Sequence, residues 1–261
     1  MLLKNLALAA AAVVPALARA TYQLDTYCDN PAMTPEELEE YKAVAIEAKT
    51  EMQRRGDVDT RAEGDITIRT YVHVLAAGQT WKEGWIPQDK VHTQMAMLNS
   101  DFASAGIKFQ LVALYYVLQE QWSKDLDPTA MKKYLRKGTY QDLNLYYVES
   151  FEKPGLGGYC TLPVADVTAG RDYSRDGCTI NHDLIAGSPV SEYDLGRTTV
   201  HEVGHWLGLR HTFEGGCSAN NDGFEDTAAE AEAAFGCPTG RNSCPDYPGV
   251  DPHYQPYGLY V

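Results

Sequence analysis

From residue 65 onward, the chain alternates between short runs rich in β-branched and aromatic residues and longer runs with apolar residues at helical spacing. The segment 87–105 shows the helical pattern most clearly, because its apolar residues recur every three or four positions and Gly106 follows it. In chain order, the pattern predicts strands over 65–77, 107–117, 143–151 and 177–184, an extended stretch over 155–163, and helices over 87–105, 128–137 and 193–207.

This alternation is typical of an α/β (α+β) fold around a mixed sheet. With 261 residues, of which 44% are hydrophobic, the chain is long enough for one folded domain with attachments. We expect that domain over 65–261, after two N-terminal segments.

The first N-terminal segment has the pattern of a secretory signal peptide over 1–20. Lys4 precedes an apolar run over 6–17, and the small residues Ala18 and Ala20 occupy the two positions that signal peptidase reads. The run is shorter than the roughly 20 apolar residues of a membrane-spanning helix. We therefore expect a secreted, extracellular protein without a membrane anchor.

The second segment, 21–64, predicts a helix followed by a polar linker. Thr34 and Pro35 begin the helix with a capping residue and a proline in its first turn. A helix with its own linker before a folded domain suggests a pro-segment, and Arg54 and Arg55 offer a dibasic processing site. A helix packed permanently on the domain is the alternative.

One histidine-rich stretch carries the chemistry. His201 and His205 are four positions apart, so a helix presents both imidazoles on one face, and Glu202 lies beside the first. At about 1.5 Å per residue, a straight helix would carry His211 roughly 9 Å beyond His205. His211 can join the other two only if the helix ends and the chain turns back. Gly208 permits this turn, because glycine adopts positive φ at little cost.

Three neutral imidazoles with an open fourth position are the ligand set of a catalytic zinc site. His201, His205 and His211 are therefore the expected ligands of one Zn²⁺, and Glu202 is the expected catalytic general base. The remaining histidines lack ligand spacing and are expected to be structural or exposed: His73, His92, His182 and His253.

The net charge of −14 and the isoelectric point of about 4.8 describe an acidic protein. Nucleic acids and anionic membrane surfaces attract basic patches. We therefore expect neither as a partner, and we expect a monomer.

The spacing HExxHxxGxxH over 201–211 resembles the signature of the metzincin metalloproteases. The flanks, INHDLIAGSPVSEYDLGRTT before it and HTFEGGC, DGFEDTAAE and GCPTGRNSCPDYPGVDP after it, are similar to the pappalysin-like branch and its secreted fungal members. The resemblance runs from about Asp65 to Pro252. It implies a twisted sheet with a backing helix and a zinc-binding active-site helix, and a zinc endopeptidase that acts on proteins or peptides. A zinc hydrolase of small non-protein substrates is a weaker alternative.

The resemblance carries two further implications. An edge strand near 156–162 would hold extended substrate by strand addition, although a plain connecting loop is equally compatible with this stretch. The acidic stretch Asp222–Thr227 could bind Ca²⁺ through hard oxygen ligands. A solvated acidic loop is the alternative there, and it is slightly favoured.

The chain has six cysteines, which secreted proteins usually pair. A Cys160–Cys178 bond would close a short loop between neighbouring extended segments. The family resemblance suggests a second bond between Cys217 and Cys244.

Cys28 and Cys237 remain, and two arrangements are open for them. They could pair with each other. Alternatively, Cys28 in the pro-like segment could reach the zinc as a thiolate and hold the enzyme latent, a cysteine switch that has precedent in the family.

The C-terminal end departs from the family pattern. Metzincins place a methionine turn below the zinc, but the last methionine here is Met131, and the residues after Pro252 read HYQPYGLYV. The floor of the metal site and a closing helix would then be missing, leaving an irregular and shortened C-terminal subdomain. Two hypotheses follow: an active secreted zinc endopeptidase, or a truncated, catalytically inactive relative that retains zinc binding at most.

Overall fold

The computed structural model describes Cys28, Ala43 and the ranges 66–164, 173–189, 194–219, 221–224, 227–234 and 238–252. The predicted signal peptide, nearly all of the predicted pro-segment, Cys237 and His253 lie outside the described residues. Within the described ranges, no helix combines the length and the apolar character needed to cross a membrane.

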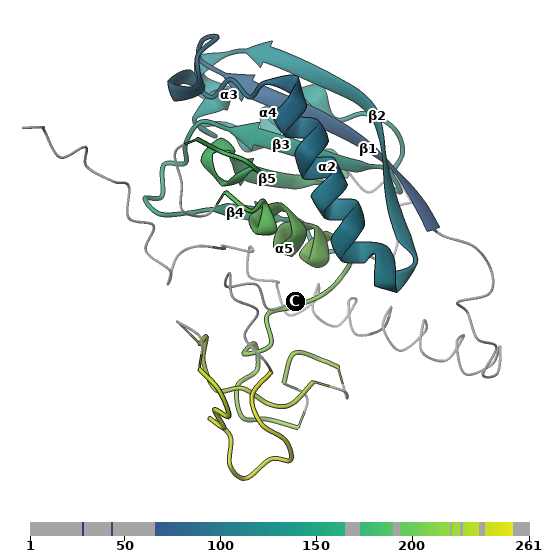
Figure 1. The fold of residues 1–261 in the computed structure, drawn as a ribbon, viewed down its shortest axis with the longest axis vertical. Helices are drawn as coiled ribbons and strands as arrows, with labels where there is room; N and C mark the ends of the chain where they lie inside the picture. Colours follow the sequence, from purple (N-terminus) through teal and green to yellow (C-terminus); the bar gives the residue numbers. More distant parts are fainter. Residues whose placement is uncertain are drawn as a thin grey trace, which may run out of the picture.

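Five strands form one sheet in the order β2-β1-β3-β5-β4. The strand β1 pairs in parallel with β2 and β3, and β3 pairs in parallel with β5, whereas β4 runs antiparallel to β5 at the edge. The sheet is therefore mixed, as predicted, and the glycine-rich stretch does contain an edge strand (Figure 1). The bounds are β1 Ile66–Ala76, β2 Ile107–Leu118, β3 Leu143–Val148, β4 Gly158–Cys160 and β5 Cys178–Asn181.

Helices cover both faces of this sheet. The central strand β3 is therefore buried along its whole length. Its residues Leu145 and Tyr147 pack into a core with the helices α2 (Gln88–Phe102) and α5 (Arg197–Trp206). Alternate residues point to the opposite face, where Tyr146 and Val148 pack against α4 (Pro128–Leu135). Figure 1 shows α2 and α5 lying across the same side of the sheet, with α5 beside β4 and β5.

The sequence pattern predicted these elements in the right order, with errors at their ends. The helix α4 ends at Leu135 because Arg136 has an extended ψ of 136°. The predicted start of the last helix at residue 193 is wrong: α5 begins at Arg197, since Gly196 before it adopts a left-handed φ of 68°. The pattern missed three short helices of the described chain, because three or four residues carry no periodicity: η3 (Trp81–Glu83), α3 (Glu120–Ser123) and η5 (His182–Leu184). The last of these replaces the end of the strand predicted over 177–184, since β5 ends at Asn181.

Candidate metal centre

The helix α5 carries two of the predicted ligands and the predicted base. The four-residue spacing places His201 and His205 on one face, with their Nε2 atoms 3.0 Å apart. Glu202 lies beside them on the side of the helix that faces β4. All three side chains are buried, and those of Glu202 and His205 have no exposed surface.

The third histidine joins them through a sharp turn. The helix ends at Trp206, and Gly208 adopts a φ of +103°. The chain then returns toward the helix, so that the ring centre of His211 lies 4.6 Å from that of His205 and 5.3 Å from that of His201. The helix stop predicted at Gly208 is confirmed, and the three predicted histidines converge.

Hydrogen bonds orient two of the imidazoles toward a common point. The Nδ1 atom of His205 lies 2.8 Å from the carbonyl oxygen of Leu209, and Nδ1 of His211 lies 3.0 Å from Oε1 of Glu214. Carbonyl and carboxylate oxygens only accept hydrogen bonds, so each Nδ1 carries the hydrogen. Each Nε2 is left with its lone pair, which is the arrangement typical of metal-binding histidines.

Burial keeps His201 and His205 neutral. Burial, together with the neighbouring histidines, lowers the pKa of His201 well below its usual value and lowers the pKa of His205 to about 4. Although burial opposes ionisation of Glu214, its hydrogen bond with His211 and the charge of Arg210 lower its pKa to about 2. His201 and His205 therefore stay neutral, and the ionised carboxylate of Glu214 fixes the tautomer of His211.

These donors fit a zinc ion. The Nε2 atoms of His201 and His205 face each other at 3.0 Å. This contact is favourable when a cation or a proton lies between the two atoms and repulsive when two lone pairs meet. In the described part of the chain, one cluster could hold a metal: Cys28 and the three histidines, whose ligand atoms all lie within 4.8 Å of one another. Tetrahedral zinc with nitrogen and sulfur ligands needs separations of about 3.3–3.8 Å, so small side-chain adjustments suffice.

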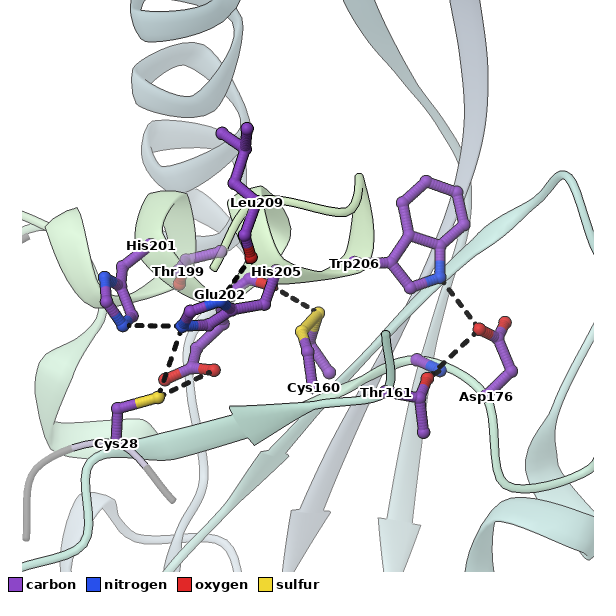
Figure 2. Close-up of a disulfide and its surroundings, with 12 residues drawn as sticks. Cys28, Cys160, Thr161, Asp176, Thr199, His201, Glu202, His205, Trp206 and Leu209 are labelled. Atoms are coloured by element: carbon purple, nitrogen blue, oxygen red, sulfur yellow. Dashed lines mark hydrogen bonds between the residues drawn. A yellow bond between two sulfur atoms is a disulfide. The ribbon is translucent and has the colours of Figure 1, made fainter. Parts of the chain in front are cut away.

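Cys28 reaches the same point from the N-terminal segment (Figure 2). Its Sγ atom lies 3.5 Å from Nε2 of His205, and its thiol donates to Oε2 of Glu202 over 3.7 Å. The backbone of Cys28 forms a parallel bridge with Gly158 on β4. The sequence left two arrangements open for Cys28: a bond with Cys237, or a position at the metal centre. The geometry of Cys28 corresponds to the second, and Cys237 lies outside the described residues.

The carboxyl group of Glu202 is fully buried. Burial raises its pKa to about 8, although the hydrogen bond from Cys28 and the charge of Lys132 act in the opposite direction. Its Oε1 atom receives no hydrogen bond from the described part of the protein. The group is therefore well suited to accept a proton and hold it.

Both predicted disulfides are present. Cys160 and Cys178 face each other in the β4–β5 pair, with Cα atoms 4.2 Å apart. The sulfur of Cys178 lies 3.4 Å from the carbonyl oxygen of Glu202, so this bond fixes the edge strand directly beside the helix (Figure 2). The second bond joins Cys217 and Cys244 beyond the metal centre.

Asp176 ties the surrounding elements together, and the sequence analysis did not identify it. Its Oδ1 atom accepts hydrogen bonds from the indole of Trp206 at 2.9 Å and from the hydroxyl of Thr161 at 3.2 Å (Figure 2). Its Oδ2 atom pairs with Arg136 at 2.8 Å. Glu214 was also missed. An acid three residues after the last histidine was its one sequence signal; Asp176 had none.

The other histidines behave as structural residues where the structure describes them. The Nε2 atom of His73 lies 3.0 Å from Asn144, that of His182 lies 2.8 Å from the carbonyl oxygen of Trp81, and that of His92 contacts Gln88 on the exposed face of α2.

The predicted calcium stretch is described only in part. Oδ1 of Asp222 accepts a hydrogen bond from the backbone of Phe224, and Glu225 and Asp226 lie outside the described residues. Calcium binding therefore stays a prediction.

Comparison with known proteins adds independent findings. The family model described as Peptidase_M43, pregnancy-associated plasma protein-A, matches residues 169–247. An extracellular metalloprotease of Neurospora crassa is 40% identical over 256 residues, covering 97% of this chain and 87% of that protein. An extracellular metalloprotease of Pyricularia oryzae is 43% identical over 217 residues, covering 83% of this chain and 75% of that protein.

Among solved structures, a promirolysin variant from Tannerella forsythia superposes with a TM-score of 0.57 at 22% identity, covering 84% of this chain and 81% of that one. At this level of identity the match supports the shared fold alone.

Proposed function

This chain belongs to the pappalysin-like family of extracellular metalloproteases, and on that premise we propose that it is a secreted zinc endopeptidase that hydrolyses peptide bonds in extracellular proteins. The observation that carries the proposal is the convergence of three imidazoles beside a buried carboxyl group. Secretion rests on the signal pattern over 1–20 and on the names of the relatives.

In this proposal, His201, His205 and His211 hold one zinc ion through Nε2. When bound, zinc supplies a Lewis acid that polarises a scissile carbonyl and lowers the pKa of a water molecule. The chain's own contribution is geometric: the turn at Gly208 sets the third ligand, and the hydrogen bonds to Leu209 and Glu214 fix the rings.

Glu202 acts as the general base. Its carboxyl oxygen takes the proton of the attacking water and later gives it to the leaving amine. Burial supports this role, because it favours the protonated form that exists between the two transfers. A carboxyl group one methylene shorter would not reach as far, and a cationic side chain could not accept the proton.

The edge strand β4 would hold the substrate. One side of β4 pairs with β5. Its other side pairs with the backbone of Cys28 at Gly158, and the carboxyl group of Glu202 lies against the face of the strand at the same residue. An extended peptide can add to such an edge by main-chain hydrogen bonds. This places a scissile bond beside the base.

Residues 21–64 would keep the unprocessed chain latent. A catalytic zinc site needs an open fourth position, whereas four protein ligands make a closed site. The Cys28 thiol, within 4.8 Å of the three histidine ligand atoms, would fill that position. Removal of the segment would open it.

The test is zinc content and casein hydrolysis of the purified secreted protein, alone and after limited proteolysis, beside a Glu202→Ala control. We expect one zinc per chain, turnover after processing, and none in the control or after chelation. Zinc without turnover would instead support the inactive relative. Protein without zinc would overturn the proposed ligand set.

A further inference from the structure

The carboxyl group of Glu202 lies directly against strand β4 at Gly158. A Cβ atom added to Gly158 would come within 3.0 Å of both Cγ and Oε1 of Glu202, and within 3.0 Å of the carbonyl oxygen of Thr179. Carbon atoms pack favourably at about 3.5–4.0 Å. Even the smallest side chain at this position therefore forces a neighbour to move.

Space, and not backbone conformation, explains glycine at this position. Gly158 does not have a positive φ, and it pairs in regular antiparallel register with Ile180. A glycine inside a strand destabilises it, because it lacks a side chain to pack and loses more conformational freedom. A close approach from outside the strand is one of the few features that offset this cost, and Glu202 makes such an approach.

The backbone at Glu202 has little room to retreat from an added methyl group. Its side chain is fully buried. Its carbonyl oxygen lies 3.4 Å from Sγ of Cys178, which is bonded to Cys160 on the same edge strand. The backbone of the helix and the strand are thus held against each other, and the carboxyl group is the part that can yield.

We propose that Gly158 is a positioning residue for the general base: its missing side chain provides the space in which the Glu202 carboxyl group lies level with the substrate-binding edge strand. This inference rests on the proposed function, because it assigns Glu202 its catalytic role. Cys28 pairs with the same glycine, so any extended chain that adds to β4 here passes the carboxyl group closely.

The kinetic test is Gly158→Ala in the full secreted chain after processing. We expect zinc content to be unchanged and KM to change by no more than about twofold, while kcat falls about 10- to 100-fold, as small displacements of a reacting group do. Gly158→Ser should lower kcat further. Unchanged kcat in both variants would overturn the proposal.

Gly78→Ala is a matched control. Its added Cβ would also meet a glutamate, Glu83, at a position without positive φ, but that side chain is exposed and can move aside. We expect its kcat to equal that of the unmodified chain. Its Tm should fall slightly, because the displaced Glu83 gives up hydrogen bonds with Thr80.

A double-mutant cycle measured by Tm tests the contact between Gly158 and Glu202 without an activity assay. In a Glu202→Ala background, two of the three close atoms are gone, so Gly158→Ala should lower Tm much less than it does beside Glu202. Equal losses in the two backgrounds would mean that Gly158 merely packs on Thr179 and would overturn the inference. If the unmodified chain neither binds zinc nor hydrolyses casein, the proposed function fails, and this cycle still decides whether Gly158 sets the position of Glu202.

Discussion

The indole nitrogen of Trp206 donates a hydrogen bond of 2.9 Å to Oδ1 of Asp176, so the last residue of α5 is fixed to the segment that leads into β5. Oδ2 of the same carboxylate pairs with Arg136 at the end of α4, and both side chains of that pair are 5% exposed. One buried carboxylate therefore joins the helices on the two faces of the sheet.

Replacing Asp176 by alanine should destabilise the fold strongly. Removing one partner of a buried ion pair leaves the other charge without compensation, and we expect the free energy of unfolding to fall by about 3–5 kcal/mol. Urea denaturation measures this. Asp176→Asn keeps an acceptor for Trp206 and should lose less, and Glu120→Ala, in an exposed pair with Lys124, should change nothing measurable. An Asp176→Ala variant as stable as the unmodified chain would refute the argument.

Replacing Glu214 by alanine should weaken zinc binding while the three ligands stay in place. Glu214 accepts a hydrogen bond from Nδ1 of His211, and loss of such an outer partner typically costs about 10- to 100-fold in metal affinity. Competition with a chromophoric chelator measures the affinity. Glu214→Gln retains an acceptor oxygen, so its zinc affinity should lie between those of Glu214→Ala and the unmodified chain. Equal zinc affinity in all three proteins would show that His211 needs no orientation by Glu214.

Replacing Cys28 by alanine should raise the activity of the unprocessed chain. The Cys28 sulfur lies 3.5 Å from Nε2 of His205, where it would occupy the fourth zinc position. We expect casein hydrolysis by the variant without prior proteolysis, and little by the unmodified precursor. In that precursor, zinc should also slow alkylation of this thiol. If the unmodified precursor and Cys28→Ala are equally latent, the segment blocks the site by its backbone and not by the thiol.

His73 should make the fold less stable in mild acid. It stacks between Tyr115 and Tyr146 at ring distances of 5.3 and 4.8 Å. Burial lowers its pKa from 6.5 to about 4, although Asn144 raises it and the charge of Lys137 lowers it slightly. Between these pH values the unfolded chain binds a proton that the folded chain does not. The contribution is complete above pH 6.5 and is lost as pH falls toward 4, by on the order of 3 kcal/mol.

Urea denaturation at pH 7 and pH 4.5 checks this dependence. The loss of stability between the two pH values should be smaller in His73→Phe, which preserves the aromatic stack. His92→Gln, on the exposed face of α2, should leave the loss unchanged. Identical pH dependence in His73→Phe and the unmodified chain would contradict the prediction.

Local spacing explains what the sequence could predict. The positions of His201 and His205 on one helix face and the turn at Gly208 follow from residues within a few positions of one another. The edge strand came from the family resemblance, because the residues alone indicated only an extended stretch. The disulfides were also predicted, one from neighbouring segments and one from the family resemblance. The start of α5 was wrong because a left-handed Gly196 ends the preceding turn, and no periodic pattern marks that change.

The features that the sequence analysis missed or left open depend on residues that are distant in sequence. Asp176 is 30 positions from Trp206, and Cys28 is 177 positions from His205. No periodicity links such residues, and only the folded sheet brings them together. The contact of Glu202 with Gly158 is of the same kind, since a glycine in a strand indicates a close approach but does not identify the approaching group.

The parallel bridge between Cys28 and Gly158 has a kinetic consequence. The open side of a three-residue strand can pair with one extended chain at a time, so the N-terminal segment and a substrate exclude each other there. Because the segment is covalently tethered, its effective concentration at the strand is on the order of millimolar. Dilution of the precursor therefore does not release the N-terminal segment from the strand. A single cut in the chain between this segment and the domain turns it into a separate peptide that diffuses away.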